Sequence, residues 1–234
     1  MTTTCLYVTS KFAAMASDTL ISGTEGDGAV YMSKSYSLPH ARVLFGFTGL
    51  RAAAECMHHA LNSGSDGTRS GDIDDFAEHG EAIAREAIER VESVFRFHGV
   101  EFTGSETLGE AYLAGWSRRR ERVTGYLIDL DAPDAGARPI PDDRLICIPS
   151  LWGRKGTTGA VSIPADFVAA FREAYECQHD GMYCEGDGPH LGGDMLLSVL
   201  TEREIRSIHI GTFANATDSS AWSRLETELA RVAA

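Results

Sequence analysis

The chain has 234 residues, 43% of them hydrophobic, and a formal net charge of −13. This length and composition suit one domain with a sizeable core, so we expect a single domain over residues 1–234. The negative charge repels phosphate and therefore disfavours a nucleic acid or an anionic membrane as a partner. The sequence has no apolar run of the ~18–20 residues that span a membrane and no signal-peptide pattern at its start, so we expect a cytoplasmic protein.

The cysteines are five in number and irregularly spaced: Cys5, Cys56, Cys147, Cys177 and Cys184. In a cytoplasmic chain this pattern predicts reduced thiols, several of them buried as small hydrophobic residues. A possible zinc-ligand group occurs late in the chain, formed by Cys177, His179, Cys184 and His190. Its C-x-H-x₄-C-x₅-H spacing is not a standard zinc pattern. We interpret the segment as a loop and expect no metal or other cofactor.

Strand patterns dominate the first fifty residues. Alternation and β-branched residues predict strands over 2–8, 12–18, 30–37 and 42–48. Along the third strand, period-two alternation would place Lys34 on one face with Met32 and Tyr36. A lysine there is unusual for a core strand, and the alternative is an edge strand with Lys34 in water. The fourth strand is apolar on both faces and ends at Gly49, where a helix over 50–61 begins.

The remainder of the chain mixes helices and strands. A long amphipathic helix is predicted over 72–97 and stops at Gly99. The arginine-rich tip at 118–122 fits a solvated hairpin turn better than a docking patch. The segment 131–143 fits a surface loop. The other predicted strands are 109–116, 122–130, 145–148, 159–163, 193–201 and 205–211, and the other helices are 164–177 and 219–232. Blocks of helices flanking blocks of strands predict an α+β fold. Its form would be a four-layer αββα sandwich, with two stacked antiparallel sheets between helical layers.

Thr2 follows the initiating Met1 and is small, so methionine aminopeptidase would normally expose it as the N-terminus. Its hydroxyl is then a nucleophile and its own α-amine a base. Because the amine has an ordinary pKa of roughly 7.7–8.0, it can accept the hydroxyl's proton near neutral pH. Retention of Met1 would remove the free amine and leave the form inactive.

Two further residues follow Thr2 at equal intervals of 16, namely Asp18 and Lys34. The stretches 2–4 and 16–18, Lys34, and 45–49 resemble the proteasome β-subunit family of N-terminal-nucleophile hydrolases. Within that family, the stretches resemble in particular the bacterial HslV-type peptidase and the related Anbu proteins. The resemblance covers roughly the first sixty residues most strongly, and the element order supports it to the C-terminus.

The resemblance implies a catalytic role for each of these residues. Thr2 Oγ would attack a peptide carbonyl, while a Lys34 ammonium disfavours protonation of the Thr2 amine and stabilises the developing alkoxide. Asp18 would keep Lys34 charged and oriented. The N–H of Gly49, at a helix N-terminus, would bind the oxyanion.

Additional site residues are predicted around this centre. Family members have Ser and Asp supports near the N-terminal amine, for which Ser162 and Asp187 are the candidates here. By spacing, Met32, Tyr36 and Phe47 would line the pocket for the residue before the cleaved bond, which suggests an apolar or aromatic preference.

These features together predict a threonine-type endopeptidase that cleaves peptide or unfolded-protein substrates. The resemblance implies a homo-oligomer, as a ring or spiral, and leaves open an ATPase unfoldase that feeds it. Two alternatives remain at this point. One is a small-molecule amidase that uses the same N-terminal-nucleophile chemistry, and the other is a non-enzymatic assembly subunit.

Overall fold

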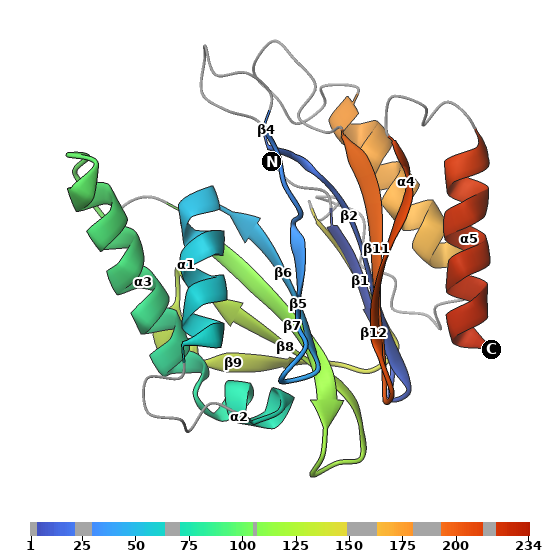
Figure 1. The fold of residues 1–234 in the computed structure, drawn as a ribbon, viewed down its shortest axis with the longest axis horizontal. Helices are drawn as coiled ribbons and strands as arrows, with labels where there is room; N and C mark the ends of the chain where they lie inside the picture. The colour runs from blue at the N-terminus through green and yellow to red at the C-terminus, as the bar shows by residue number, and fades with distance from the viewer. Residues whose placement is uncertain are drawn as a thin grey trace.

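The fold is a sandwich of two five-stranded antiparallel sheets, each covered on its outer face by helices (Figure 1). The computed structural model describes residues 4–21, 30–63, 71–104, 107–148, 163–179, 193–212 and 219–234. The architecture is the α+β, four-layer αββα arrangement expected from the order of the elements.

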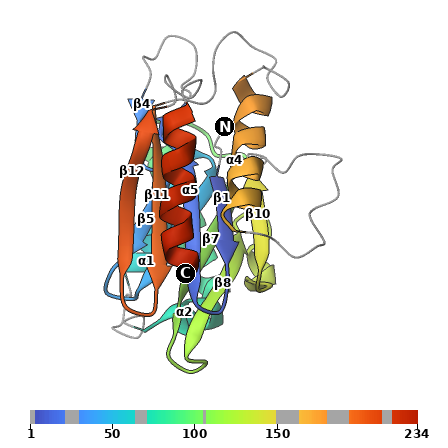
Figure 2. The same ribbon diagram turned by 90° about the vertical axis from the view of Figure 1, so that its right-hand side faces the viewer.

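The first sheet contains the strand nearest the N-terminus. Its strand order is β10-β1-β2-β11-β12, so β1 and β2 lie inside the sheet. The strands are β1 (Thr4–Val8), β2 (Phe12–Asp18), β10 (Arg144–Ile148), β11 (Asp194–Thr201) and β12 (Ile205–Thr212). Helices α4 (Ala165–His179) and α5 (Ser219–Ala233) cover its outer face, as Figure 2 shows. Trp222 of α5 packs edge-on against Phe171 of α4 in the core beneath them.

The second sheet has the strand order β5-β6-β7-β8-β9. Its strands are β5 (Ser35–Leu38), β6 (Val43–Gly49), β7 (Gly109–Ser117), β8 (Arg122–Asp129) and β9 (Ala137–Ile140). The helices on this side are α1 (Arg51–Asn62), α2 (Ile73–Glu78) and α3 (Gly80–Phe97), and a short 3₁₀ turn, η1 (Pro133–Ala135), precedes β9. A separate two-stranded ribbon joins β3 (Leu20–Ile21) to β4 (Val30–Tyr31).

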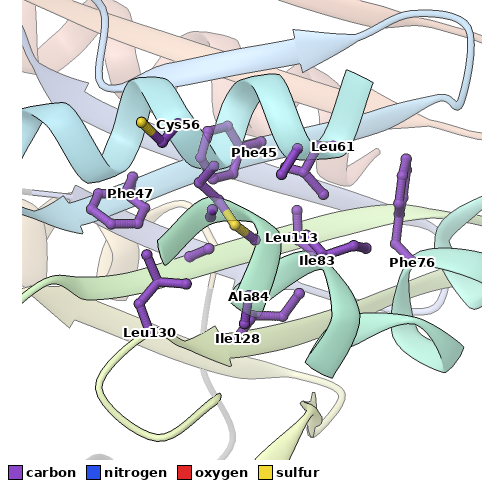
Figure 3. Close-up of a cluster of buried hydrophobic side chains, with 14 of the residues drawn as sticks. Phe45, Phe47, Cys56, Leu61, Phe76, Ile83, Ala84, Leu113, Ile128 and Leu130 are labelled. Atoms are coloured by element: carbon purple, nitrogen blue, oxygen red, sulfur yellow. The ribbon is translucent and has the colours of Figure 1, made fainter. Parts of the chain in front are cut away.

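Each interface between layers has its own apolar core. The core under α1 and α3 holds Phe45, Phe76 and Ile83, all fully buried (Figure 3). Between the two sheets, the Met15 side chain packs directly over Gly46, where an added Cβ would lie 2.5 Å from Met15 Sδ.

Two predicted elements of the helical side need correction. The helix over 72–97 is interrupted at His79, between α2 and α3. Asp72 starts α2 with a capping box, and a Cβ on Gly80 would lie only 2.6 Å from the backbone nitrogen of Ala137, so α3 begins in close contact with β9. The segment 131–143 is also more ordered than the predicted loop, because it forms η1 and the edge strand β9.

The predicted strand over 30–37 is split into β4 and β5. Met32 N–H donates to Thr19 O, whereas Lys34 O accepts from Phe47 N–H in β6. Between Met32 and Lys34 the backbone therefore changes its hydrogen-bond partner, from Thr19 next to β3 to Phe47 in β6 of the second sheet. A single alternating face along 30–37 was the wrong expectation, although β5 is an edge strand as the alternative proposed.

The prediction of reduced thiols is wrong for Cys5 and Cys147, which form a disulfide. They are direct partners in the β1–β10 register, with Cα atoms 4.3 Å apart, which matches a non-hydrogen-bonded antiparallel pair. Because 142 residues separate them, only the sheet register brings them together. Cys56 is a buried free thiol, as expected. Among the described helices, none is long and apolar enough to cross a membrane.

Candidate active site

A buried ion pair between Asp18 and Lys34 bridges the two sheets. Asp18 is the last residue of β2, and Lys34 directly precedes β5. Lys34 Nζ lies 2.7 Å and 2.8 Å from the two carboxylate oxygens of Asp18. The Asp18 side chain is 0% exposed and that of Lys34 is 7% exposed. The predicted alternative, with Lys34 in water, is therefore wrong.

The burial of Lys34 changes its acid–base chemistry. Desolvation lowers the pKa of the Lys34 ammonium below its ordinary value, and the Asp18 carboxylate opposes this shift by favouring the charged form. The ammonium is consequently easier to deprotonate than that of a surface lysine. A buried group with a shifted pKa and a specific charged partner is typical of a functional site.

The backbone around Lys34 is held from both sheets. Ser33 Oγ accepts a hydrogen bond from Ser35 N–H and donates one to Ser35 O. Ser35 Oγ in turn lies 3.2 Å from Ser198 Oγ of β11, in the other sheet. Sequence reasoning missed Ser198, because 163 residues separate it from Ser35 and no motif marks it.

Gly49 forms the corner between β6 and α1 and has a φ of +135°. Directly opposite it lies Gly109 of β7, with a φ of +114°. A Cβ on Gly49 would be 2.2 Å from Leu108 O, and one on Gly109 would be 2.0 Å from Thr48 O. Both positions therefore require glycine. Because the Thr48 carbonyl points toward β7, the Gly49 N–H of the same planar peptide points to the opposite side.

That opposite side is the side of Lys34. Phe47 N–H donates to Lys34 O at 3.4 Å, and N–H groups two residues apart along a strand point the same way. The Gly49 N–H is thus directed past the start of β5, on the side from which Lys34 enters that strand. Helix α1 starts immediately afterwards, and within this fully described helix no side chain caps the N-terminus and no acid occupies the first turn. The positive end of the helix dipole is therefore not offset by an acidic group there.

Several predicted site residues lie outside the described part of the chain, namely Thr2, Ser162, Asp187, Cys184 and His190. Cys177 and His179 belong to α4, but their side chains are not described. The strand that Thr2 was predicted to open is present, since β1 begins at Thr4 and pairs there with Ser17. No group of three metal-ligating side chains occurs among the residues that the structure describes.

Two of the three residues predicted to line a specificity pocket pack into the core beneath α1. Phe47 is 3% exposed and belongs to the core beneath α1. Tyr36 packs against the same core, stacked on Phe45 with ring centroids 5.5 Å apart and in contact with His58 of α1. Met32 lies ahead of the point where the chain changes sheets. Period-two spacing failed here because the strand is not continuous.

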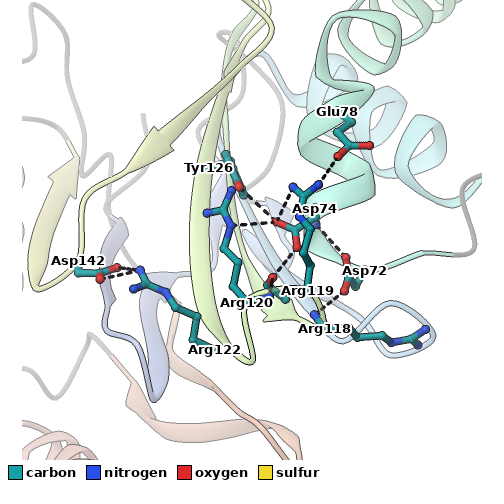
Figure 4. A network of polar contacts seen from close by, with 10 residues as sticks. Asp72, Asp74, Glu78, Arg118, Arg119, Arg120, Arg122, Tyr126 and Asp142 are labelled. Carbon is teal, nitrogen blue, oxygen red and sulfur yellow. Dashed lines mark hydrogen bonds and ion pairs between the residues drawn. The ribbon is translucent and has the colours of Figure 1, made fainter.

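A second polar network lies at the other end of β7, around the arginine-rich turn (Figure 4). Asp72 caps α2 and accepts a hydrogen bond from Arg118 N–H at 2.6 Å. Asp74 accepts from Ser117 Oγ and lies 3.6 Å from Arg120 Nε. The predicted solvated turn is therefore also clamped to α2 by acidic side chains.

The two stacked sheets and the helices that cover them have the fold of Anbu structures, in agreement with the fold that the sequence resemblance implied. Anbu from Hyphomicrobium sp. strain MC1 superposes with a TM-score of 0.62 at 12% identity, over 99% of this chain and 94% of that one. A Gly-1 mutant of the same protein gives a TM-score of 0.61 at 12% identity, over 100% and 96% of the two chains.

Anbu from Yersinia bercovieri, described as an ancestral beta-subunit, gives a TM-score of 0.60 at 12% identity, over 98% of this chain and 93% of that one. No protein-family model matches the chain, and no curated protein matches its sequence. At this level of identity the likeness establishes the fold, and chemistry must be argued from the residues.

Proposed function

We propose that the protein is a threonine-type endopeptidase with Thr2 as its nucleophile after removal of Met1. The observation that carries this proposal is the buried Asp18–Lys34 pair beside the Gly49 corner. Thr4 is paired with Ser17, the residue before Asp18. Two residues of extended chain span at most ~7 Å. The proposal therefore requires the Thr2 hydroxyl to come within that reach of Thr4, next to the pair.

In the proposed reaction, Thr2 Oγ attacks the peptide carbonyl carbon and its proton passes to the Thr2 α-amine. The ammonium of Lys34 favours the neutral form of that amine and stabilises the forming alkoxide, while Asp18 keeps Lys34 in place. The oxyanion is bound by the Gly49 N–H. Collapse of the tetrahedral intermediate breaks the C–N bond, and the leaving amine takes the proton.

The resulting ester on Thr2 is then hydrolysed by a water that the freed α-amine activates, which regenerates the hydroxyl. The proposed substrate is a peptide or an unfolded protein, since the bond that this chemistry breaks is an amide. We include in the proposal a homo-oligomeric assembly, by analogy with the fold. Ser162 and Asp187 remain the candidates for supporting the amine.

The test compares Thr2→Ala with the matched control Thr3→Ala. Intact mass establishes first whether Met1 is removed, and a set of fluorogenic peptides then measures turnover. We expect Thr2→Ala to lose at least about 10³-fold in kcat, whereas Thr3→Ala keeps more than a third of the activity. Equal turnover by wild type and Thr2→Ala would contradict the proposal. Turnover of small amides but of no peptide would identify an amidase instead.

A further inference from the structure

The back of the Gly49 corner is held by a carboxylate that the proposed reaction does not use. Asp131, just after β8, accepts hydrogen bonds from Leu108 N–H at 2.7 Å and from Gly109 N–H at 3.2 Å. Gly109 O also accepts from the N–H of Leu130, the residue before Asp131. The segment 130–131 therefore binds the start of β7 through three hydrogen bonds.

A single peptide group links this carboxylate to the corner. The Leu108 carbonyl and the Gly109 N–H belong to the same planar peptide and point in opposite directions. Asp131 holds the N–H side, and the carbonyl side accepts a hydrogen bond from Leu50 N–H at 2.9 Å. Leu50 is the N-cap of α1 and directly follows Gly49. A charged acceptor on one side of a peptide polarises and strengthens the hydrogen bond on the other.

The contact between Gly49 and Gly109 also couples the positions of their two peptide segments. The Cα atoms of Gly49 and Gly109 face each other so closely that neither can carry a Cβ. The Thr48 carbonyl is directed at Gly109, and the orientation of that peptide sets the direction of the Gly49 N–H. A shift of Gly109 therefore moves the Thr48–Gly49 peptide with it.

We propose that Asp131 is a positioning residue for the oxyanion site, which it acts on through the Leu108–Gly109 peptide and Gly49. This inference rests on the proposed function. Asp131 touches neither the substrate nor the reacting atoms. Its carboxylate fixes the position of the Gly49 N–H, which is the hydrogen-bond donor to the developing oxyanion. The alignment of this donor with the oxyanion decides how well the tetrahedral state is bound. A misplacement of about 1 Å at such a donor can cost on the order of 10²-fold in rate.

The test uses Asp131→Ala, Asp131→Asn and the matched control Asp134→Ala. Asp134 is an exposed neighbouring aspartate that pairs with Arg85 on α3. The first readout needs no activity, because it is the hydrogen-exchange rate of the Leu50 amide in the full-length assembly. We expect about a tenfold faster exchange in Asp131→Ala, an intermediate rate in Asp131→Asn, which keeps one acceptor oxygen, and less than a twofold change in Asp134→Ala.

The second readout compares two probes of Thr2. A peptide aldehyde forms a tetrahedral adduct whose oxygen occupies the oxyanion site, whereas a peptide vinyl sulfone adds to the hydroxyl without forming a carbonyl oxyanion. We expect Asp131→Ala to weaken aldehyde binding about tenfold and to change the vinyl sulfone rate by less than threefold. Equal losses for both probes would show a merely structural role and overturn the inference.

Unchanged Leu50 exchange in Asp131→Ala would also overturn it, whatever the probes report. A wild-type protein that reacts with neither probe would instead overturn the proposed function. The exchange measurement would then still decide whether Asp131 fixes the corner, so the two failures are distinguishable.

Discussion

Two buried carboxylates lie at opposite ends of the sandwich and differ in what surrounds them. Asp18 is 0% exposed, and the ammonium that binds it is itself buried. Asp74 is nearly as buried, but the arginines beside it are exposed, with Arg119 at 61% and Arg120 at 43%. The hydroxyl groups of Ser117 and Tyr126 also donate to the Asp74 carboxylate. Figure 4 shows Tyr126 and the arginines beside it.

The difference separates a network that supports the fold from one that can carry chemistry. Exposed arginines remain solvated, so their ion pairs contribute little and are screened by salt. The Asp18–Lys34 pair loses the solvation of both charges, which shifts the pKa of Lys34 and makes each partner depend on the other. Burial of both partners, more than the number of ion pairs, therefore marks the candidate active site.

The largest effect is expected from breaking the buried pair. Lys34→Met leaves the Asp18 carboxylate buried without its ammonium, which should lower the free energy of unfolding by about 3–5 kcal/mol and abolish peptide turnover. The double variant Asp18→Leu, Lys34→Met should recover most of that stability, because a buried pair can be replaced by apolar residues, yet stay inactive. Chemical denaturation checks both, and a double variant as unstable as the single one would contradict the explanation.

The Asp18–Lys34 pair should make both kcat/KM and the free energy of unfolding depend on pH. Because burial lowers the pKa of Lys34, the alkaline limb of kcat/KM should fall below pH 10.5, and Asp18→Asn should move it lower still by removing the charge that opposes the shift. Between the lowered pKa and that of the unfolded chain, the unfolded state binds more protons. The contribution of Lys34 to stability should therefore rise with pH across that window.

Gly49→Ala should give the next largest effect. The substitution places a Cβ 2.2 Å from Leu108 O at a φ of +135°, so we expect a loss of about 2–4 kcal/mol together with loss of turnover. Gly99→Ala is the matched control, since its φ is +68° but nothing lies within 4 Å of the new Cβ, and it should cost only ~1 kcal/mol. Similar unfolding free energies for the two variants would show that the corner is not tightly packed.

At the opposite end, Asp72→Ala should reduce stability without affecting turnover. It removes the N-cap of α2 and the acceptor for Arg118 N–H, which should cost about 1–2 kcal/mol. Asp72→Asn, which still caps the helix, should lose less. A fall in kcat for Asp72→Ala at unchanged stability would show that this end also communicates with the site.

The smallest effect is expected for Arg119→Ala. Its guanidinium lies 2.8 Å from Glu78 but is largely solvated, so the midpoint of thermal unfolding should hardly change. Any difference from wild type should disappear at high salt, which screens exposed pairs. A decrease in the unfolding midpoint that persists in 1 M salt would contradict this prediction, because it would show that the Arg119 ion pair is shielded from solvent.

Local patterns predicted most elements well. The strands β2 and β6, the helix after Gly49 and the β7–β8 hairpin lie where alternation and turn residues indicate. Prediction failed where an element depends on a distant partner. Residues 30–37 split because they bond to different sheets, and β9 forms because β8 offers it an edge.

The sequence by itself determined the αββα order of elements, and its resemblance to the proteasome β-subunit family nominated Thr2, Asp18 and Lys34 as the residues of the candidate site. Local periodicity is sufficient for the order of elements, since it depends on neighbours along the chain. Only the tertiary structure showed that Asp18 and Lys34 form a buried pair, that Cys5 meets Cys147, and that Asp131 holds the back of the Gly49 corner. These contacts depend on sheet register and burial, which arise only when segments distant in sequence pack together.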